Sequence, residues 1–244
     1  MKTNKGFTLT EILLAVMIVG LIGVALASLT TTATRETTTG RSRITLRNSL
    51  SLALRQIRQD IHESSQVLYV KGVIDPSETE MLPLLVLGKN VRMSGESILT
   101  DQSVQYIAYC FNRGTTTKLS NGANVLPSQA VDGGTIYRRE FSEKPTDIST
   151  VCSATGRRAL LHNVKFIPSS SVTADNYPVP FFGLKDYSNE RKTNDMDFLA
   201  NAYESDIASR LYIYLIVELP IAPVVNEVAE EMFALPNGFE VIGD

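Results

Sequence analysis

The chain has 244 residues, of which 43% are hydrophobic, with a formal net charge of −3 and a pI of about 5.5. This composition is typical of a globular, mildly acidic protein. The chain also lacks the surplus of lysine and arginine found in dedicated nucleic-acid-binding proteins, so we do not expect nucleic acid to be a main partner.

An apolar run follows the first lysines of the chain. From Ile12 to Leu29 no residue is charged, and these roughly 18 residues would form a helix of about 27 Å, close to the hydrocarbon thickness of a bilayer. Lys2 and Lys5 precede the run, and Arg35 is the first charged residue after it. By the positive-inside rule we expect one inner-membrane span, with a short cytoplasmic N-terminus and an extracytoplasmic remainder.

A secretory signal peptide is an alternative interpretation of this run. Such peptides have a shorter apolar region followed by a small-residue cleavage site. Residues 25–27, Ala-Leu-Ala, are the only candidate for that site. The length of the run favours an anchor that stays in the mature protein.

Glu11 is an acidic residue directly before the apolar run. A carboxylate at the centre of a bilayer costs about 2.5–3.5 kcal/mol on insertion scales, so a segment that served only as an anchor would be better without it. Two explanations are open. The acid either pairs with an opposite charge, or lies at the headgroup level as a first-turn acid that the helix dipole favours.

Residues 5–11, Lys-Gly-Phe-Thr-Leu-Thr-Glu, followed at once by the apolar helix, resemble the class III signal of type IV prepilins and type II secretion pseudopilins. The resemblance combines a basic leader, Gly6, Phe7 and an acid four residues later in one register. It implies that a prepilin peptidase cleaves between Gly6 and Phe7 and methylates the new amino terminus. It also implies an assembly role for Glu11, which would pair with the Phe7 amine of a neighbouring subunit.

The sequence and the resemblance together predict four segments. They are a leader (1–6), a transmembrane and assembly helix (7–29), the remainder of a helical stem (30–63) and an extracytoplasmic β-rich domain (64–244). Removing the leader deletes two lysines and changes the formal charge from −3 to −5. The roughly 180 residues after the stem are enough for one domain with a sizeable core.

The end of the stem is predicted to be an amphipathic helix. One face carries apolar residues three or four positions apart, namely Leu46, Leu50, Leu54, Ile57 and Ile61, while Arg47, Arg55, Arg58, Gln59 and Glu63 are polar. Residues 30–40 are rich in threonine and end in Gly40, and both residue types lower helix propensity. We therefore expect a weak joint in this segment.

Strands and long connections are predicted for the rest of the chain. Residues 211–219 alternate most clearly, and their odd-numbered side chains should face the helix. Weaker strands are predicted at 67–70, 84–87, 104–111, 135–141, 160–167 and 239–242, and a long loop at 168–205. A helix followed by strands indicates an α+β class, and the resemblance implies a pilin-like fold, in which the second half of a long helix packs on an antiparallel sheet.

Cys110 and Cys152 fall on the side of the membrane that we predict to be oxidising, so we expect a disulfide between them. Two unpaired buried thiols are the alternative.

Signals for catalysis are weak. His62 and His162 are the only histidines, and neither accompanies a nucleophile or metal motif, so we expect no enzyme activity. Four acidic residues could bind calcium together, namely Asp186, Glu190, Asp195 and Asp197. Their spacing does not match an EF-hand loop, so a solvated acidic loop is the preferred interpretation. We expect no metal and no cofactor, with calcium as the one candidate.

The pattern Leu50-x-x-x-Leu54-x-x-Ile57-x-x-Asp60-Ile61, with a strand-rich end, more loosely resembles the minor pseudopilin J and minor pilin W group. This implies a structural subunit near the filament tip that initiates or caps a type IV pilus or a type II secretion pseudopilus. Implied partners are the prepilin peptidase, other major and minor pilins or pseudopilins, the inner-membrane assembly platform and membrane lipid. Glu11 argues against the tip-most pseudopilin K, which typically lacks the acid.

A pilus-tip binding module, either an adhesin or a DNA-capturing pilin, is the alternative function. The two pairs of adjacent arginines at 138–139 and 157–158 are the only basic signal for it.

Overall fold

The computed structural model describes residues 8–70, 81–91, 103–114, 133–145, 148–152, 155–165, 181–186, 208–219 and 225–234. The chain forms two compact units, Met1–Ser42 and Arg43–Asp244. The first contains the early turns of the long helix, and the second contains the end of that helix and the sheet.

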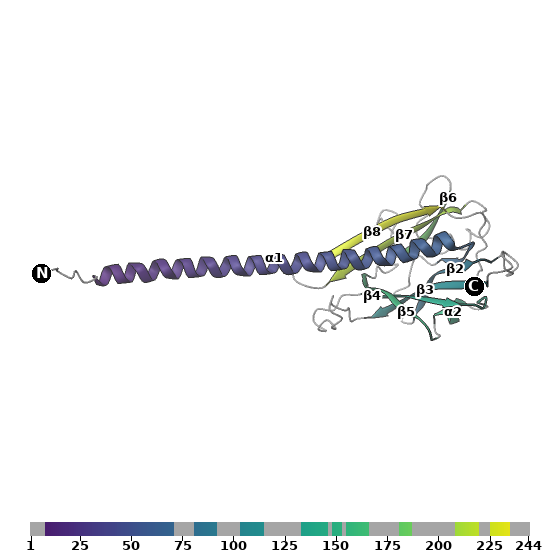
Figure 1. Cartoon of the computed structure of the whole chain (residues 1–244), viewed down its shortest axis with the longest axis horizontal. Coiled ribbons are helices and arrows are strands. Elements are labelled where there is room, and N and C mark those ends of the chain that lie inside the picture. The colour runs from purple at the N-terminus through teal and green to yellow at the C-terminus, as the bar shows by residue number, and fades with distance from the viewer. Residues whose placement is uncertain are drawn as a thin grey trace, which may run out of the picture. The chain divides into compact units, whose positions relative to one another are not determined.

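Helix α1 (Leu9–Glu63) is continuous (Figure 1). It runs without interruption through residues 30–40, where a weak joint was expected. Most threonine hydroxyls in this segment donate to the carbonyl oxygen four residues earlier, as in Thr34 Oγ1 to Thr30 O at 2.8 Å. Each of these bonded hydroxyls is thus satisfied within the helix, which offsets the low helix propensity of threonine.

The described strands form one antiparallel sheet in the order β1-β2-β3-β4-β5-β7-β6, with β8 also paired to β7. The strands are β1 (Gln66–Val70), β2 (Leu82–Lys89), β3 (Gln105–Gly114), β4 (Gly133–Phe141), β5 (Arg158–Lys165), β6 (Phe181–Asp186), β7 (Ala208–Leu219) and β8 (Val225–Ala234). A short helix, α2 (Ile148–Val151), lies between β4 and β5 in the sequence. The α+β, pilin-like fold class is therefore confirmed.

Strand β7 is paired along both edges. Strand β8 pairs with it from Arg210 to Leu219, while β6 pairs with its first half and β5 joins it through Val164 and Val217. Since a strand has two edges, β5 and β6 share the edge opposite β8. Strand β8 is therefore an edge strand among the described residues.

The main core lies between the sheet and the end of α1. The odd-numbered residues of β7 are buried in the same cluster as the apolar face of the helix, as predicted; this cluster includes Leu46, Leu50, Leu54, Ile57, Ile61, Leu211, Ile213, Leu215, Val217 and Leu219. A second cluster, with Tyr106, Cys110 and Cys152, covers the other face of the sheet. Strand β3 contributes to both, because its side chains alternate between the two faces.

Most of the predicted strands are confirmed, and two strands were missed. Residues 67–70, 84–87, 104–111, 135–141, 160–167 and 211–219 coincide with β1, β2, β3, β4, β5 and β7 to within a few residues. The loop prediction for 168–205 is wrong at β6, and β8 was not predicted at all. The strand predicted at 239–242 lies outside the described residues.

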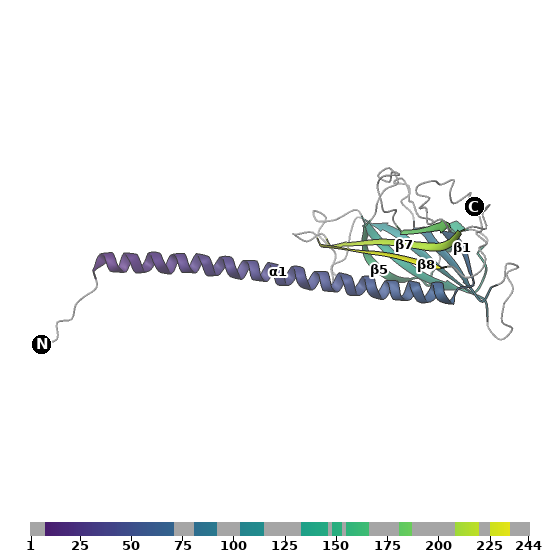
Figure 2. The same ribbon diagram turned by 90° about the horizontal axis from the view of Figure 1, so that it is seen from above.

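Ion pairs fix one flank of α1 against β8. Glu227 lies 3.3 Å from the guanidinium of Arg47, and Glu231 lies 2.7 Å from that of Arg58. The two arginines are about 16 Å apart along the helix axis, and the two glutamates are about 13 Å apart along the strand. Helix and strand therefore run in the same direction with matched spacing, and Figure 2 shows them side by side from a second direction.

Candidate functional site

The first turn of α1 is closed by Thr8 and Glu11. The Thr8 amide and its hydroxyl both donate to Glu11 Oε2, each at 2.9 Å. The Glu11 amide in turn approaches Thr8 Oγ1 at 3.4 Å and donates to Thr8 O at 3.1 Å. This reciprocal arrangement is a capping box, with Thr8 as N-cap and Glu11 at the third helical position.

The capping box decides where the Glu11 carboxylate points in the isolated chain. It is directed back toward the amide of Thr8, the first described residue, and not along the apolar surface of the helix. The interpretation as a first-turn acid therefore describes the unassembled state. Pairing with a neighbour's amine would compete with the bonds to Thr8, so the two explanations of Glu11 can apply in sequence, before and after assembly.

The predicted cleavage and methylation sites, Gly6 and Phe7, lie outside the described residues. Cleavage after Gly6 and methylation of Phe7 remain predictions.

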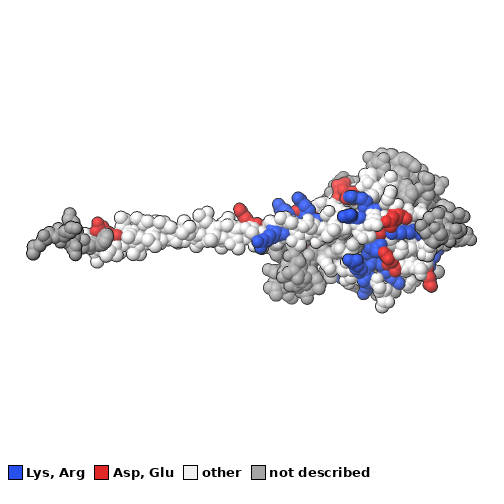
Figure 3. Space-filling view, viewed as in Figure 1, with Lys and Arg blue, Asp and Glu red and all other residues white. Residues whose placement is uncertain are grey.

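The part of α1 that follows Glu11 exposes an apolar surface. Its large side chains are at least half exposed in nearly every case, for example Leu21 at 70%. In Figure 3 this part of the helix is a long white stretch with charged side chains at both ends. Within the described residues α1 is the one helix long and apolar enough to cross a membrane. Such a surface needs a lipid or protein environment.

Residues 1–27 match a family described as the prokaryotic N-terminal methylation motif. The chain carries a type IV pilin-like class III signal. The match covers the signal and most of the membrane segment, and it does not extend into the sheet domain. No curated protein and no solved structure matches the chain.

This class III signal supports a type IV pilin or pseudopilin subunit. It implies processing by a prepilin peptidase and assembly with other pilins, and together with the apolar start of α1 it supports anchoring in the membrane. Members of this class are structural subunits, so the signal does not point to catalysis.

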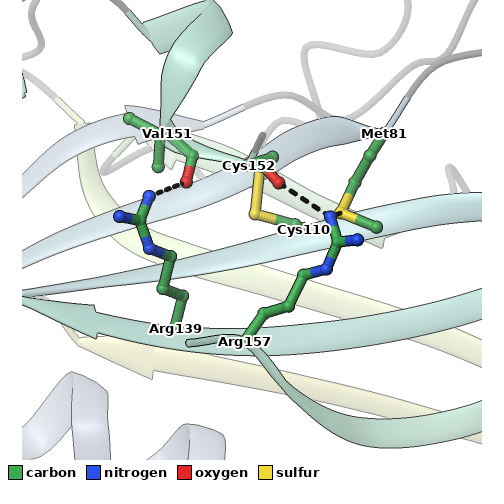
Figure 4. The surroundings of a disulfide bond; sticks show 6 residues. All are labelled: Met81, Cys110, Arg139, Val151, Cys152 and Arg157. Carbon is green, nitrogen blue, oxygen red and sulfur yellow. Dashed lines mark hydrogen bonds between the residues drawn. A yellow bond between two sulfur atoms is a disulfide. The ribbon is translucent and has the colours of Figure 1, made fainter. Parts of the chain in front are cut away.

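Cys110 in β3 and Cys152 after α2 form a disulfide, with Cα atoms 5.8 Å apart and both residues buried. Figure 4 shows an arginine on either side of this bond. Arg139 donates to the carbonyl oxygen of Val151, and Arg157 donates to that of Cys152 at 3.1 Å. The two guanidinium groups therefore hold the end of the α2 segment over the sheet.

The adjacent arginines considered as a nucleic-acid signal serve the domain itself. Besides binding backbone carbonyls, Arg139 lies over the Phe141 ring at 5.2 Å and Arg157 over the Tyr137 ring at 5.6 Å. Arg138 is engaged by the carboxylate of Asp60. Three of these four arginines thus have internal partners, which weakens the case for a DNA-capturing module.

A buried polar cluster around Asp60 was not identified from the sequence. The Asp60 side chain is 1% exposed and accepts hydrogen bonds from three neighbours on the sheet: Arg138 in β4, the Tyr109 hydroxyl in β3 and Lys89 at the end of β2. Gln56, one helical turn earlier, adds a fourth donor at 3.2 Å. This cluster fixes the flank of α1 opposite the one held by β8.

Electrostatics keep Asp60 ionised. Burial disfavours its charged form, but hydrogen bonds from Arg138 and Tyr109 and the positive charges of Arg138 and Lys89 outweigh that cost and hold the pKa of Asp60 below its ordinary value. Burial and the adjacent carboxylate raise the pKa of the Tyr109 hydroxyl well above its usual value. Tyr109 therefore remains a neutral donor to a charged acceptor.

The histidines are placed as surface residues. His62 is exposed in the last turn of α1, and His162 is exposed in β5, where its Nδ1 lies 3.1 Å from Thr135 Oγ1. Neither shows the constellation of groups that catalysis would need.

The calcium hypothesis falls largely on residues outside the described ranges. Asp186 ends β6, whereas Glu190, Asp195 and Asp197 lie outside the described residues. Among the residues that the structure describes, no group of three or more metal-ligating side chains is present. The absence of a cofactor stays an expectation.

Proposed function

We propose that this protein is a minor pilin or pseudopilin that initiates or caps a type IV pilus or a type II secretion pseudopilus. The observation that carries the proposal is the class III signal, with Glu11 retained, on a helix that continues into a large disulfide-bonded domain. The signal supplies the assembly chemistry. The roughly 180 residues after α1 make a domain larger than is usual for a major pilin, which favours a specialised position.

The loose resemblance of the segment from Leu50 to Ile61 to the minor pseudopilin J and minor pilin W group supports the same proposal. Asp60 in this pattern anchors the helix to the sheet. The proposed location is the inner membrane, with the N-terminus in the cytoplasm and the domain outside it, followed by the filament. The proposed partners are other major and minor pilins and the inner-membrane assembly platform.

The position in the filament is tested by deleting the gene and counting filaments, then complementing with graded expression. An initiating subunit predicts that filament number falls sharply while the length and composition of the remaining filaments change little. Immunogold labelling of the domain should mark filament ends. A shaft subunit would instead be labelled uniformly along the filament, and the total filament mass would rise in proportion to its expression level.

A further inference from the structure

The uncharged part of α1 is longer than its strongly apolar part. No residue from Ile12 to Thr34 is charged, and Arg35 is the first cation after this stretch. At about 1.5 Å per residue, Arg35 lies about 34 Å along the axis from Ile12, which exceeds the roughly 30 Å hydrocarbon core of a bilayer. The helix can therefore remain in the membrane beyond Leu29 if its threonines tolerate that environment.

The threonine side chains of this stretch carry their own hydrogen bonds. Thr30 Oγ1 donates to Leu26 O at 2.6 Å, and Thr32 Oγ1 donates to Ser28 O at 3.0 Å. Thr31 Oγ1 likewise donates to Ala27 O, and Thr34 Oγ1 donates to Thr30 O. A hydroxyl that donates to its own helix needs no water, so burying these threonines in lipid costs less than burying free hydroxyls.

The charges at the two ends of this stretch match the bilayer. Glu11 and Arg35 are separated by about 36 Å along the helix axis, which is more than the roughly 30 Å hydrocarbon core and less than the roughly 40–45 Å of a bilayer with its headgroups. Both charges can therefore lie in opposite interfacial layers at the same time. Shifting the helix by one turn in either direction would draw one of them about 2 Å past the edge of the hydrocarbon, where a charge is disfavoured.

Arg35 is chemically suited to a phosphate at this depth. Its side chain is exposed, and its neighbour Glu36 points to a different side of the helix because consecutive helical residues do not face each other. The guanidinium fork binds phosphate oxygens through two parallel hydrogen bonds. The next cation, Arg41, is about 9 Å further from the membrane, beyond the headgroup layer.

We propose that α1 is embedded in the bilayer as far as Thr34 and that the Arg35 guanidinium binds phospholipid phosphate at the surface opposite Glu11. Arg35 thereby fixes the depth of the helix, and with it the height of Glu11 in the other interface. This inference requires membrane insertion of α1, but it does not depend on the proposed minor, initiating or capping role.

Contact with phosphate is tested by solid-state NMR on the full chain. The protein is labelled with carbon-13 at the arginine guanidino carbon and reconstituted into bilayers of phosphatidylethanolamine and phosphatidylglycerol, and dipolar dephasing by lipid phosphorus is measured. We expect the dephased signal to be lost in Arg35→Gln. Arg55→Gln is the matched control, an exposed arginine of the same helix about 30 Å further along, and should keep the signal. Equal dephasing in wild type and Arg35→Gln would overturn the proposal.

The depth of the threonines is tested separately by cysteine labelling in the same bilayers. The native cysteines are both in the disulfide, so an introduced cysteine is the sole free thiol. We expect Thr38→Cys to react with a membrane-impermeant maleimide as the exposed control Leu52→Cys does, and Thr31→Cys to stay unlabelled as Met17→Cys does. Labelling of Thr31→Cys at the rate of Thr38→Cys would show that the membrane segment ends near Leu29 and would overturn the embedded position of the threonines.

Discussion

Asp60 and Arg138 are 78 residues apart in the sequence and form a two-point ion pair, with Arg138 Nε 2.5 Å from Asp60 Oδ2 and Nη2 2.9 Å from Oδ1. The pair joins the last turns of α1 to the middle of the sheet. On the opposite flank, Arg47 and Arg58 pair with glutamates of β8. The helix thus presents an acidic residue to the sheet on one side and two basic residues on the other. These ion pairs on opposite flanks fix the rotation of the helix about its axis.

Replacing Asp60 with asparagine should destabilise the domain by about 3–5 kcal/mol, because one partner of a buried ion pair is removed and the Arg138 charge is left with less compensation. The measurement is urea unfolding of the detergent-solubilised chain, followed by the near-ultraviolet signal of its tyrosines. Glu63→Gln is the control. Glu63 pairs with the same Lys89 but is far more exposed, so its loss should cost at most about 1 kcal/mol. If both substitutions lowered the free energy of unfolding equally, the buried ion pair of Asp60 would be no stronger than the exposed one of Glu63, and the prediction would be wrong.

The Asp60 carboxylate also makes the stability of the domain depend on pH. The pKa of Asp60 is lower in the folded chain than in the unfolded chain, where it is about 3.9. Its contribution is therefore fully present above the unfolded value and is lost as the pH falls through the lower, folded value. The difference in unfolding free energy between wild type and Asp60→Asn should be constant from pH 7 to about pH 5 and shrink below about pH 4. A difference that stays constant into acid would exclude this role.

The disulfide should contribute about 3–4 kcal/mol to stability, because it closes a loop of 42 sequence positions and so restricts the unfolded chain. The double variant Cys110→Ala and Cys152→Ala removes it without burying a hydroxyl group. Its unfolding midpoint should match that of the wild-type chain under reducing conditions, and adding reductant to the variant should change nothing further. A midpoint equal to that of the oxidised wild type would contradict the prediction.

Processing is predicted to produce a mature chain that begins at Phe7, since Gly6 matches the residue before the cleaved bond in class III signals. Intact-mass spectrometry of filament fractions should show loss of residues 1–6 and one added methyl group. The variant Gly6→Leu should retain its leader and remain in the membrane. An intact Met1 in assembled material would mean that assembly needs no cleavage, and a new terminus near Ala27 would mean that a different peptidase acts; either result would contradict the prediction.

The parts of the fold predictable from sequence are those whose side-chain period matches one buried face. The stem helix and β7 belong to this group, because Leu50, Leu54 and Ile57 recur at helical spacing while Leu211, Ile213 and Leu215 alternate. The start of α1 was predictable for a different reason. Its charge-free length reflects the thickness of a bilayer, and the class III pattern lies within seven consecutive residues.

The missed elements depend on partners far away in the sequence. Strand β8 has three glutamates, and its two buried residues, Val225 and Ala229, are four positions apart, a spacing that resembles a helix more than a strand. It is a strand because it pairs with β7 along its whole length and because Glu227 and Glu231 meet arginines of α1. The role of Asp60 was hidden in the same way, since its partner Arg138 is on a different element.

The last prediction concerns Glu11. If its carboxylate pairs with the Phe7 amine of a neighbouring subunit, Glu11→Gln should leave membrane insertion and domain folding intact, because the amide removes a charge that is costly to bury. Incorporation into filaments should fall. The measurement compares variants at equal membrane levels by crosslinking to partner pilins and by counting filaments.

Thr8→Ala separates pairing from capping, because it breaks the capping box at a cost of about 1 kcal/mol but keeps the Glu11 charge. If pairing between subunits is the role of Glu11, Thr8→Ala should assemble nearly as the wild type does, while Glu11→Gln fails. The Thr8 variant loses the hydroxyl bond to the carboxylate, while the backbone amide of residue 8 can still donate to it. If Glu11 only stabilises the first turn, both variants should lose at most about 1 kcal/mol of helix stability and assemble alike. Equal assembly of the two variants would therefore remove the assembly role from Glu11.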